Sequence, residues 1–381
     1  MHLHPLEDEL LSSWLTRMAH AHYMYPTTFL NLHIKNTRKN SYTRKDLDFY
    51  DNQEFFDLLA MKSILTKEEL HKISLRSQEG YLFINQSLYP PQQIRRLIDK
   101  RTHFGLMYCP KCLETDEIPY WRKKWRYFFY TACPKHKIFL TDRCWHCYKP
   151  IKLLKTELTD KIKYCSNCGA DLGLTDTHQD NIPDDYGLEA IRWFEEGLER
   201  GYFEINGQKV WSVMFFHIFC RLYYLLDRKQ DLVLKNFSKL DEYKLICKKL
   251  EVYNSKKASA IYKTFYVNSM IYHLFKNFPF NFLDFIQSNH LTYKEFTHGL
   301  KYIPYWYERM LKELIPKENK SGRIISESEV IGAINYLERQ DKIVNQKNVA
   351  EIVGCHFTIH KGFVKIYKNS QSKICFTFSP S

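Results

Sequence analysis

The chain has 381 residues, and its 56 lysines and arginines outnumber its 43 aspartates and glutamates, which gives a formal net charge of +13. A chain of this length predicts two to four domains rather than a single core. The basic excess favours a polyanionic partner, with nucleic acid first, and a generally basic proteome is the alternative explanation. Seven of the eleven cysteines lie in one stretch, residues 109–168, where most of them occur in pairs separated by two residues. This pattern fits a reducing cytoplasm and argues against a disulfide scaffold.

The sequence predicts a cytoplasmic protein without a membrane anchor. Its start is acidic and lacks the basic region of a secretory signal. The most apolar run, residues 210–226, contains His217 and Arg221 and falls short of a bilayer span. We expect this run to form a buried helix.

Residues 1–100 are expected to form a helical domain with helix-turn-helix character. Residues 25–28 predict a turn and cap, and residues 31–44 a polar, basic surface loop. The second helix of a later pair begins at the capping box Thr66–Glu69. A helix-turn-helix and plain bundle packing both fit this pair, and bundle packing is slightly favoured. Apolar residues of the first helix recur at helical spacing, at Leu10, Leu11, Trp14, Leu15 and Met18.

Four pairs of potential metal ligands organise residues 101–175. Two residues separate the members of each pair, the spacing at which both side chains of a turn reach one ion. Eight ligands make two closed tetrahedral shells, so we expect a tandem zinc-knuckle module with two structural zinc ions (Zn²⁺) and no open catalytic position. His146 is an alternative ligand. The expected ligands are Cys109, Cys112, Cys133 and His136 for one ion, and Cys144, Cys147, Cys165 and Cys168 for the other.

A basic and aromatic segment lies between the zinc pairs. From Trp121 to Pro150 there are eight lysines and arginines and one acid, Asp142. Cations interleaved with aromatic rings can bind phosphates while the rings pack or stack on bases. We expect the rings to pack between the zinc sites and the cations to bind DNA, with a merely solvated basic face as the alternative. The candidate DNA contacts here are Arg122, Lys123, Lys124 and Arg126.

Residues 176–320 predict a helical scaffold without a functional site. Aromatic and aliphatic residues recur from Trp193 to Leu226, and Phe278–Pro279 marks a break between helices. The isolated Cys220 and Cys247 are expected to be buried thiols. The predicted domains are therefore residues 1–100, 101–175, 176–320 and 321–381.

The last domain is predicted to be a C-terminal helix-turn-helix within a mostly α protein. A capping box at Ser326–Glu329 begins its first helix, residues 345–354 form a short helix ended by glycine, and Phe357–Tyr367 form the third. The third helix of such a unit can enter the major groove of DNA. Ile359 comes one position early for the motif, so a packing domain is the alternative. The candidate DNA contacts are Lys361, Lys365 and Lys368.

Two groups of motifs resemble the TniQ/TnsD family of transposon target-site selection proteins. The first is the opening stretch from Pro5 to Ala19, which contains Glu9-Leu10-Leu11-Ser12-Ser13-Trp14. The second is the zinc region, where Tyr108-Cys109-Pro110-Lys111-Cys112 is followed by Ile118-Pro119-Tyr120-Trp121-Arg122 and the later zinc pairs. The helical region around Phe278 and the tail resemble the TnsD side of the family less specifically.

The resemblance implies an adaptor that selects the target site for DNA transposition, and not a transposase. Such proteins mark a DNA site, either by reading sequence or through a guide-RNA Cascade complex, and recruit the AAA+ ATPase TnsC. The expected partners are therefore target DNA, TnsC and, by the second route, Cascade with its guide RNA; a homodimer stays open. A sequence-specific transcriptional regulator is the second hypothesis. An enzyme is the third, and it is disfavoured because the sequence offers no cluster of carboxylates around an open metal position.

Overall fold

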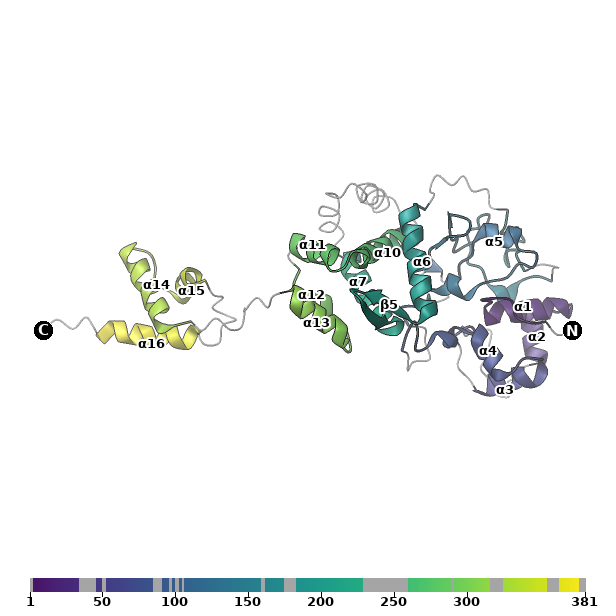
Figure 1. The fold of residues 1–381 in the computed structure, drawn as a ribbon, viewed down its shortest axis with the longest axis horizontal. Coiled ribbons are helices and arrows are strands. Elements are labelled where there is room, and N and C mark those ends of the chain that lie inside the picture. Colours follow the sequence, from purple (N-terminus) through teal and green to yellow (C-terminus); the bar gives the residue numbers. More distant parts are fainter. Residues whose placement is uncertain are drawn as a thin grey trace. The chain divides into compact units, whose positions relative to one another are not determined.

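The chain folds into two compact units, residues 1–314 and 315–381, and both are mainly helical (Figure 1). The expected mostly α fold is confirmed, whereas the domain boundaries at residues 100, 175 and 320 stay predictions. None of the described helices has the length and apolar character needed to cross a membrane. The computed structural model describes residues 3–33, 46–49, 53–84, 91–95, 98–99, 103–104, 106–158, 162–174, 183–228, 260–289, 291–315, 325–354 and 363–376.

In the part of residues 1–84 that the structure describes, four helices and a short 3₁₀ turn begin the first unit. Every residue from Leu11 to Ala19 of the first helix is buried, because neighbouring elements cover this helix on all sides. The capping box at Thr66 is present: its hydroxyl accepts the Glu69 N–H, and its own N–H donates to the Glu69 carboxylate. The elements are α1 (Leu11–Ala21), α2 (Pro26–His33), α3 (Gln53–Lys62), α4 (Lys67–Ile73) and η2 (Leu75–Gln78).

The zinc region follows and consists of short elements joined by turns. Its strands have two residues each and pair antiparallel as β1–β2 and β3–β4. So little regular structure leaves most of its backbone to be fixed by side chains. The elements are β1 (Ile98–Asp99), β2 (His103–Phe104), α5 (Pro110–Thr115), η3 (Lys123–Arg126), β3 (Ala132–Cys133), β4 (Ile138–Phe139) and η4 (Leu153–Lys155).

A helical scaffold with one β-hairpin completes the first unit. The predicted buried helix of residues 210–226 begins only at Ser212, because Val210 and Trp211 belong to the second strand of the hairpin. Asn206 and Gly207 form its two-residue turn, both with positive φ, which is a strong hairpin signal that the sequence analysis missed. The elements are α6 (Asp185–Arg200), β5 (Tyr202–Ile205), β6 (Gln208–Trp211), α7 (Ser212–Arg228), α10 (Ala260–Lys276), α11 (Phe280–Ser288), α12 (Tyr293–Thr297) and α13 (Tyr305–Leu314).

Two glycines of α6 let aromatic rings approach its backbone. A Cβ atom at Gly187 would lie 2.1 Å from the ring of Phe265 on α10, and one at Gly197 would lie 2.1 Å from the ring of Phe203 on β5. The ring of Phe203 packs into an aromatic core with α7, where it lies tilted against the ring of Phe215 with 4.0 Å between the ring centroids. The predicted break at Phe278–Pro279 is confirmed, since it separates α10 from α11.

The described residues of the second unit form three helices, α14 (Glu327–Arg339), α15 (Gln346–Val353) and α16 (Phe363–Phe376). The capping box at Ser326 is present, and Gly354 ends α15 in the left-handed conformation, as predicted. The predicted third helix was to end at Tyr367, but α16 continues to Phe376 because no glycine or proline interrupts it. Residues 355–362 lie outside the described part of the chain, and so do the expected basic loop at 34–45 and Cys247.

Candidate metal centres

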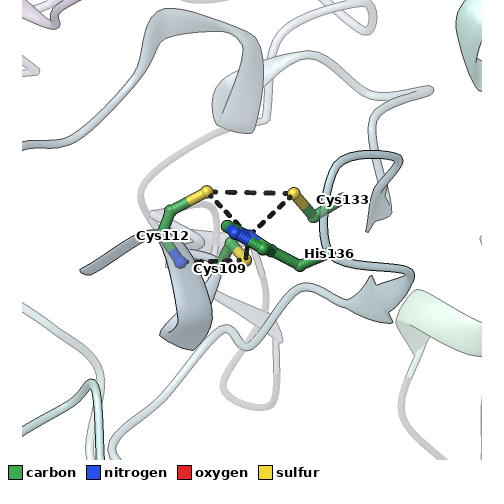
Figure 2. A group of neighbouring side chains, drawn as sticks. All are labelled: Cys109, Cys112, Cys133 and His136. Atoms are coloured by element: carbon green, nitrogen blue, oxygen red, sulfur yellow. Dashed lines mark hydrogen bonds between the residues drawn. The ribbon is translucent and has the colours of Figure 1, made fainter. Parts of the chain in front are cut away.

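The first candidate metal centre is formed by Cys109, Cys112, Cys133 and His136 (Figure 2). The Sγ atoms of Cys112 and Cys133 lie 3.8 Å apart, and His136 Nδ1 lies 3.3 Å from Cys112 Sγ. A tetrahedral zinc ion with Zn–S bonds of about 2.3 Å places its sulfurs about 3.8 Å apart. The four ligands therefore already have the separation that one zinc ion needs.

Local backbone structure fixes these ligands in pairs. Cys109 is the N-cap of α5, where its sulfur accepts the N–H of Cys112, and Pro110 occupies the first helical position. Cys133 ends β3, and the turn into β4 is closed by a hydrogen bond of 2.8 Å from the Lys137 N–H to the Cys133 carbonyl. This turn carries His136 back toward the cysteines.

The second centre contains Cys144, Cys147, Cys165 and Cys168. Its Sγ atoms lie 3.7 Å apart between Cys144 and Cys168, and 3.8 Å apart between Cys147 and Cys165. His146, the alternative ligand, is exposed and does not belong to this group. Each centre can hold one zinc ion with four protein ligands, so neither keeps the open position of a catalytic zinc.

The two centres differ in their access to solvent. In the first, all three cysteines are buried, whereas in the second Cys168 is exposed and Cys147 is partly exposed.

A rigid link connects the centres: Tyr108 pairs with Thr141 through two backbone hydrogen bonds, and its hydroxyl donates to the Arg143 carbonyl, one residue before Cys144.

The basic segment 122–126 is occupied by contacts inside the protein. Arg122 is 12% exposed, pairs with Asp116 at 2.7 Å and lies over the ring of Tyr120. Lys123 donates to the backbone carbonyl of Lys72 at 2.6 Å, and burial lowers its pKa. These contacts bind the segment to the rest of the first unit and leave these two side chains little surface to offer to DNA.

Lys124 and Arg126 are held in the same way. Lys124, at 33% exposure, pairs with Glu195 of α6 at 3.2 Å. Arg126 is fully buried, and the expectation that it contacts DNA is wrong, because its three guanidinium nitrogens all donate to groups within the protein. The buried Trp121 and Trp125 pack edge to face, as expected for rings that fill the module.

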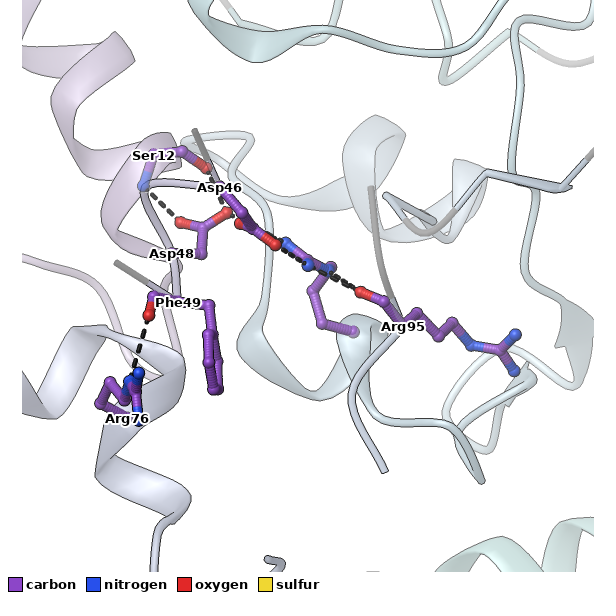
Figure 3. A network of polar contacts seen from close by, with 7 residues as sticks. Ser12, Asp46, Asp48, Phe49, Arg76 and Arg95 are labelled. Carbon is purple, nitrogen blue, oxygen red and sulfur yellow. Dashed lines mark hydrogen bonds and ion pairs between the residues drawn. The ribbon is translucent and has the colours of Figure 1, made fainter. Parts of the chain in front are cut away.

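Arg126 belongs to a polar network whose members Ser12, Asp46, Asp48 and Arg95 are labelled in Figure 3. Its guanidinium donates to Asp46 at 2.6 Å and 3.2 Å, to Asp48 at 3.3 Å and to the carbonyl of Arg95 at 2.7 Å and 3.0 Å. Asp48 in turn accepts the N–H and the hydroxyl of Ser12, in the first turn of α1. Burial and the neighbouring Asp46 raise the pKa of Asp48 to about 6, against the opposing effect of Arg126 and Ser12.

A second buried ion pair connects the opening motif with the zinc region. Arg17 donates to both carboxylate oxygens of Glu9, at 2.8 Å and 2.7 Å, and Ser13 donates to Glu9 as well. The Ser13 hydroxyl accepts the backbone N–H of Trp121, and the Leu10 N–H donates to the Trp121 carbonyl. The sequence analysis quoted Glu9 only as part of a motif and did not single out Arg17; their separation by two helical turns was the available signal. No sequence signal distinguished Asp48.

The tail lysines are placed differently from those of the zinc region. Lys365 and Lys368 are exposed and three residues apart on α16, while Phe363 and Tyr367 of the same helix are buried in the core of the second unit. Ile366 is partly buried against that core. Lys361 and Ile359 lie outside the described residues.

Comparison with known proteins identifies the first part of the chain. No curated protein gives a significant match. Proteins of the TniQ family are non-catalytic adaptors, and a TniQ domain suggests partners in the transposition machinery. Residues 1–140, which include the opening motif, the Arg126 network and the first metal centre, match the TniQ family model, so this is a transposition-associated protein that carries a TniQ domain, consistent with the TniQ/TnsD family.

Proposed function

We propose that this protein is a non-enzymatic adaptor that binds the target DNA of a transposon and recruits the AAA+ ATPase TnsC. The observation that carries the proposal is the TniQ domain at residues 1–140. In this role the two zinc ions stabilise the first unit and take no part in chemistry. Their ligands are Cys109, Cys112, Cys133 and His136 for one ion, and Cys144, Cys147, Cys165 and Cys168 for the other.

The three helices of residues 325–376 support direct contact with DNA. The glycine turn after α15 and the exposed Lys365 and Lys368 on α16 are features of a helix-turn-helix whose last helix lies on DNA. Phosphates bound there release counterions, so affinity should fall steeply with salt. Lys361 extends the same basic sequence and belongs to the proposal.

The polar groups of the first unit support an adaptor rather than an enzyme. In the described residues the potential metal-binding groups are the two cysteine-rich centres. The paired acids Asp46 and Asp48 are held by Arg126 and do not surround an open position. A nuclease would need carboxylates around a metal ion that can still bind water or substrate.

Recruitment of TnsC is tested by a pull-down with the purified full-length chain as bait. We expect TnsC to be retained when a duplex that carries the transposon's insertion site is present. Lys365→Ala with Lys368→Ala should reduce the retention that depends on DNA, whereas Lys294→Ala with Lys301→Ala, which removes two exposed lysines of the first unit, should not. Retention only when Cascade and its guide RNA are added would replace direct reading by the guide-RNA route. Failure to retain TnsC in every combination would refute the proposal.

A further inference from the structure

A surface of the first unit combines exposed aromatic and amide groups with lysines that form no ion pair with other described residues. We call it the α2–η4 surface and define it as the exposed residues of the α1–α2 turn, of α2 and of η4 with its N-cap. Tyr23 is 84% exposed, Tyr25 50% and Leu32 59%. Its other exposed members are Thr28, Asn31, Lys152 and Lys155. Thr27 is partly buried and does not belong to the surface.

Packing brings the two segments of this surface together, although they are far apart in sequence. The 3₁₀ turn η4 packs against both α1 and α2. Leu154 packs on the core of the N-terminal helices, and the hydroxyl of Thr156 lies 3.2 Å from His20 Nε2 of α1. Leu154 is directed inward, and the exposed Lys152 and Lys155 lie beside the helices α1 and α2. Both lysines belong to the chain segment that follows the first two cysteines of the second metal centre.

The charge of these segments is one-sided. The sequence from Leu10 to Lys45 contains no aspartate or glutamate. The arginine of α1, Arg17, is neutralised by the buried Glu9. Because α1 and α2 contain no aspartate or glutamate, these helices contribute no exposed acid. Among the described residues around η4, Glu157 is the exposed acid, and neither Lys152 nor Lys155 forms an ion pair with another described residue. This contrasts with Lys111, Lys124, Lys137 and Lys163 of the same region, which all pair with acids.

We propose that the α2–η4 surface is a second DNA contact, in which Lys152 and Lys155 bind backbone phosphates and Tyr23 and Tyr25 pack against the adjoining sugars. That the nucleic acid is duplex DNA rests on the proposed function. The charge of the surface matches a polyanion, and its tyrosine and asparagine side chains are groups that commonly contact phosphate and sugar. This surface replaces Arg122, Lys123, Lys124 and Arg126 as the proposed DNA contact of the first unit.

The test measures the affinity of the full-length chain for a fluorescein-labelled random-sequence duplex by anisotropy, over a range of salt concentrations. Lys152→Ala with Lys155→Ala should weaken binding at low salt about tenfold and lower the salt slope by roughly two units, because two phosphate contacts are lost. Lys294→Ala with Lys301→Ala removes the same charge elsewhere and should leave both unchanged. Tyr23→Ala should weaken binding while the slope stays the same, since the ring carries no charge. Zinc content and melting temperature verify that each variant is folded.

Three results would overturn the inference, and they are distinguishable from failure of the proposed function. If Lys365→Ala with Lys368→Ala weakens binding while Lys152→Ala with Lys155→Ala does not, the tail is the DNA contact and the proposed function stands without this surface. If the α2–η4 variants bind the duplex normally but lose retention of TnsC, the surface contacts protein. If they lose affinity for guide RNA and keep it for duplex DNA, the ligand is RNA. A wild-type chain that binds no duplex at any salt concentration would refute direct DNA binding as a whole.

Discussion

Arg126 and Asp48 form a fully buried ion pair, 3.3 Å long, between the zinc region and the N-terminal helices. Asp48 also accepts hydrogen bonds from Ser12 at the start of α1, and Arg126 also donates to Asp46 and to the carbonyl of Arg95. Removal of one partner would leave a buried charge without compensation, which is far more costly than the loss of an exposed pair. The pair therefore makes the orientation of α1 dependent on the zinc region.

Arg126→Ala should destabilise the first unit by about 3–5 kcal/mol, because Asp46 and Asp48 are left facing each other in a buried site. The control is Lys137→Ala, which breaks the exposed pair with Asp185 and should cost at most about 1 kcal/mol. Chemical denaturation of both variants, with zinc content determined in parallel, measures the difference. Equal stabilities would mean that the Arg126 network does not hold the unit together.

The cost of Asp48→Asn should depend on pH. Because the pKa of Asp48 is raised to about 6 in the folded protein, the folded state binds a proton more readily than the unfolded state, and this group's contribution to stability falls as pH rises through 6. The free energy of unfolding of the wild type, measured relative to Asp48→Asn, should therefore be larger at pH 5 than at pH 8 by about 1 kcal/mol. The comparison requires that both proteins retain zinc at both pH values. A pH-independent difference, or one of opposite sign, would contradict the raised pKa.

Purified protein should contain two zinc ions per chain, and the two should differ in lability. Cys112→Ser and Cys147→Ser should each remove one ion and lower the melting temperature, because zinc binding is coupled to folding. A chelator should extract zinc first from the second centre, where Cys168 is exposed. His146→Ala should retain both ions and serves as the control. Elemental analysis that returned one ion or none for the wild type would refute the assignment.

Gly197→Ala should destabilise the first unit by about 1–3 kcal/mol, although alanine is the better helix former. Its Cβ would lie 2.1 Å from the ring of Phe203, which is enclosed by the aromatic core and cannot move aside without displacing its neighbours. Gly332→Ala on α14 is the matched control: nothing lies within 4 Å of its added Cβ, and it should stabilise the second unit by roughly 0.5–1 kcal/mol. Thermal unfolding of the two variants measures both effects. A neutral Gly197→Ala would show that the ring of Phe203 has room to move.

Features written in a few consecutive residues were determined by the sequence itself. The eight metal ligands were predictable because each pair sits in one turn, where two intervening residues fix the separation of the side chains. The capping boxes at Thr66 and Ser326 and the glycine end of α15 follow in the same way from local hydrogen bonds and backbone conformation. The Asn206–Gly207 hairpin turn was equally local and could have been predicted.

Whether each charged residue is buried in an ion pair or exposed to solvent was decided only by the tertiary structure. Arg126 and Lys155 look alike in the sequence as cations in a basic region, yet Arg126 is buried against Asp46 and Asp48, eighty residues away or nearly so, while Lys155 is exposed beside α2. Whether a lysine or arginine meets a carboxylate or solvent depends on which distant segment packs against it. Local spacing carries no information about that contact, so the sequence determined the metal centres, and the long-range packing around them determined which cations remain exposed.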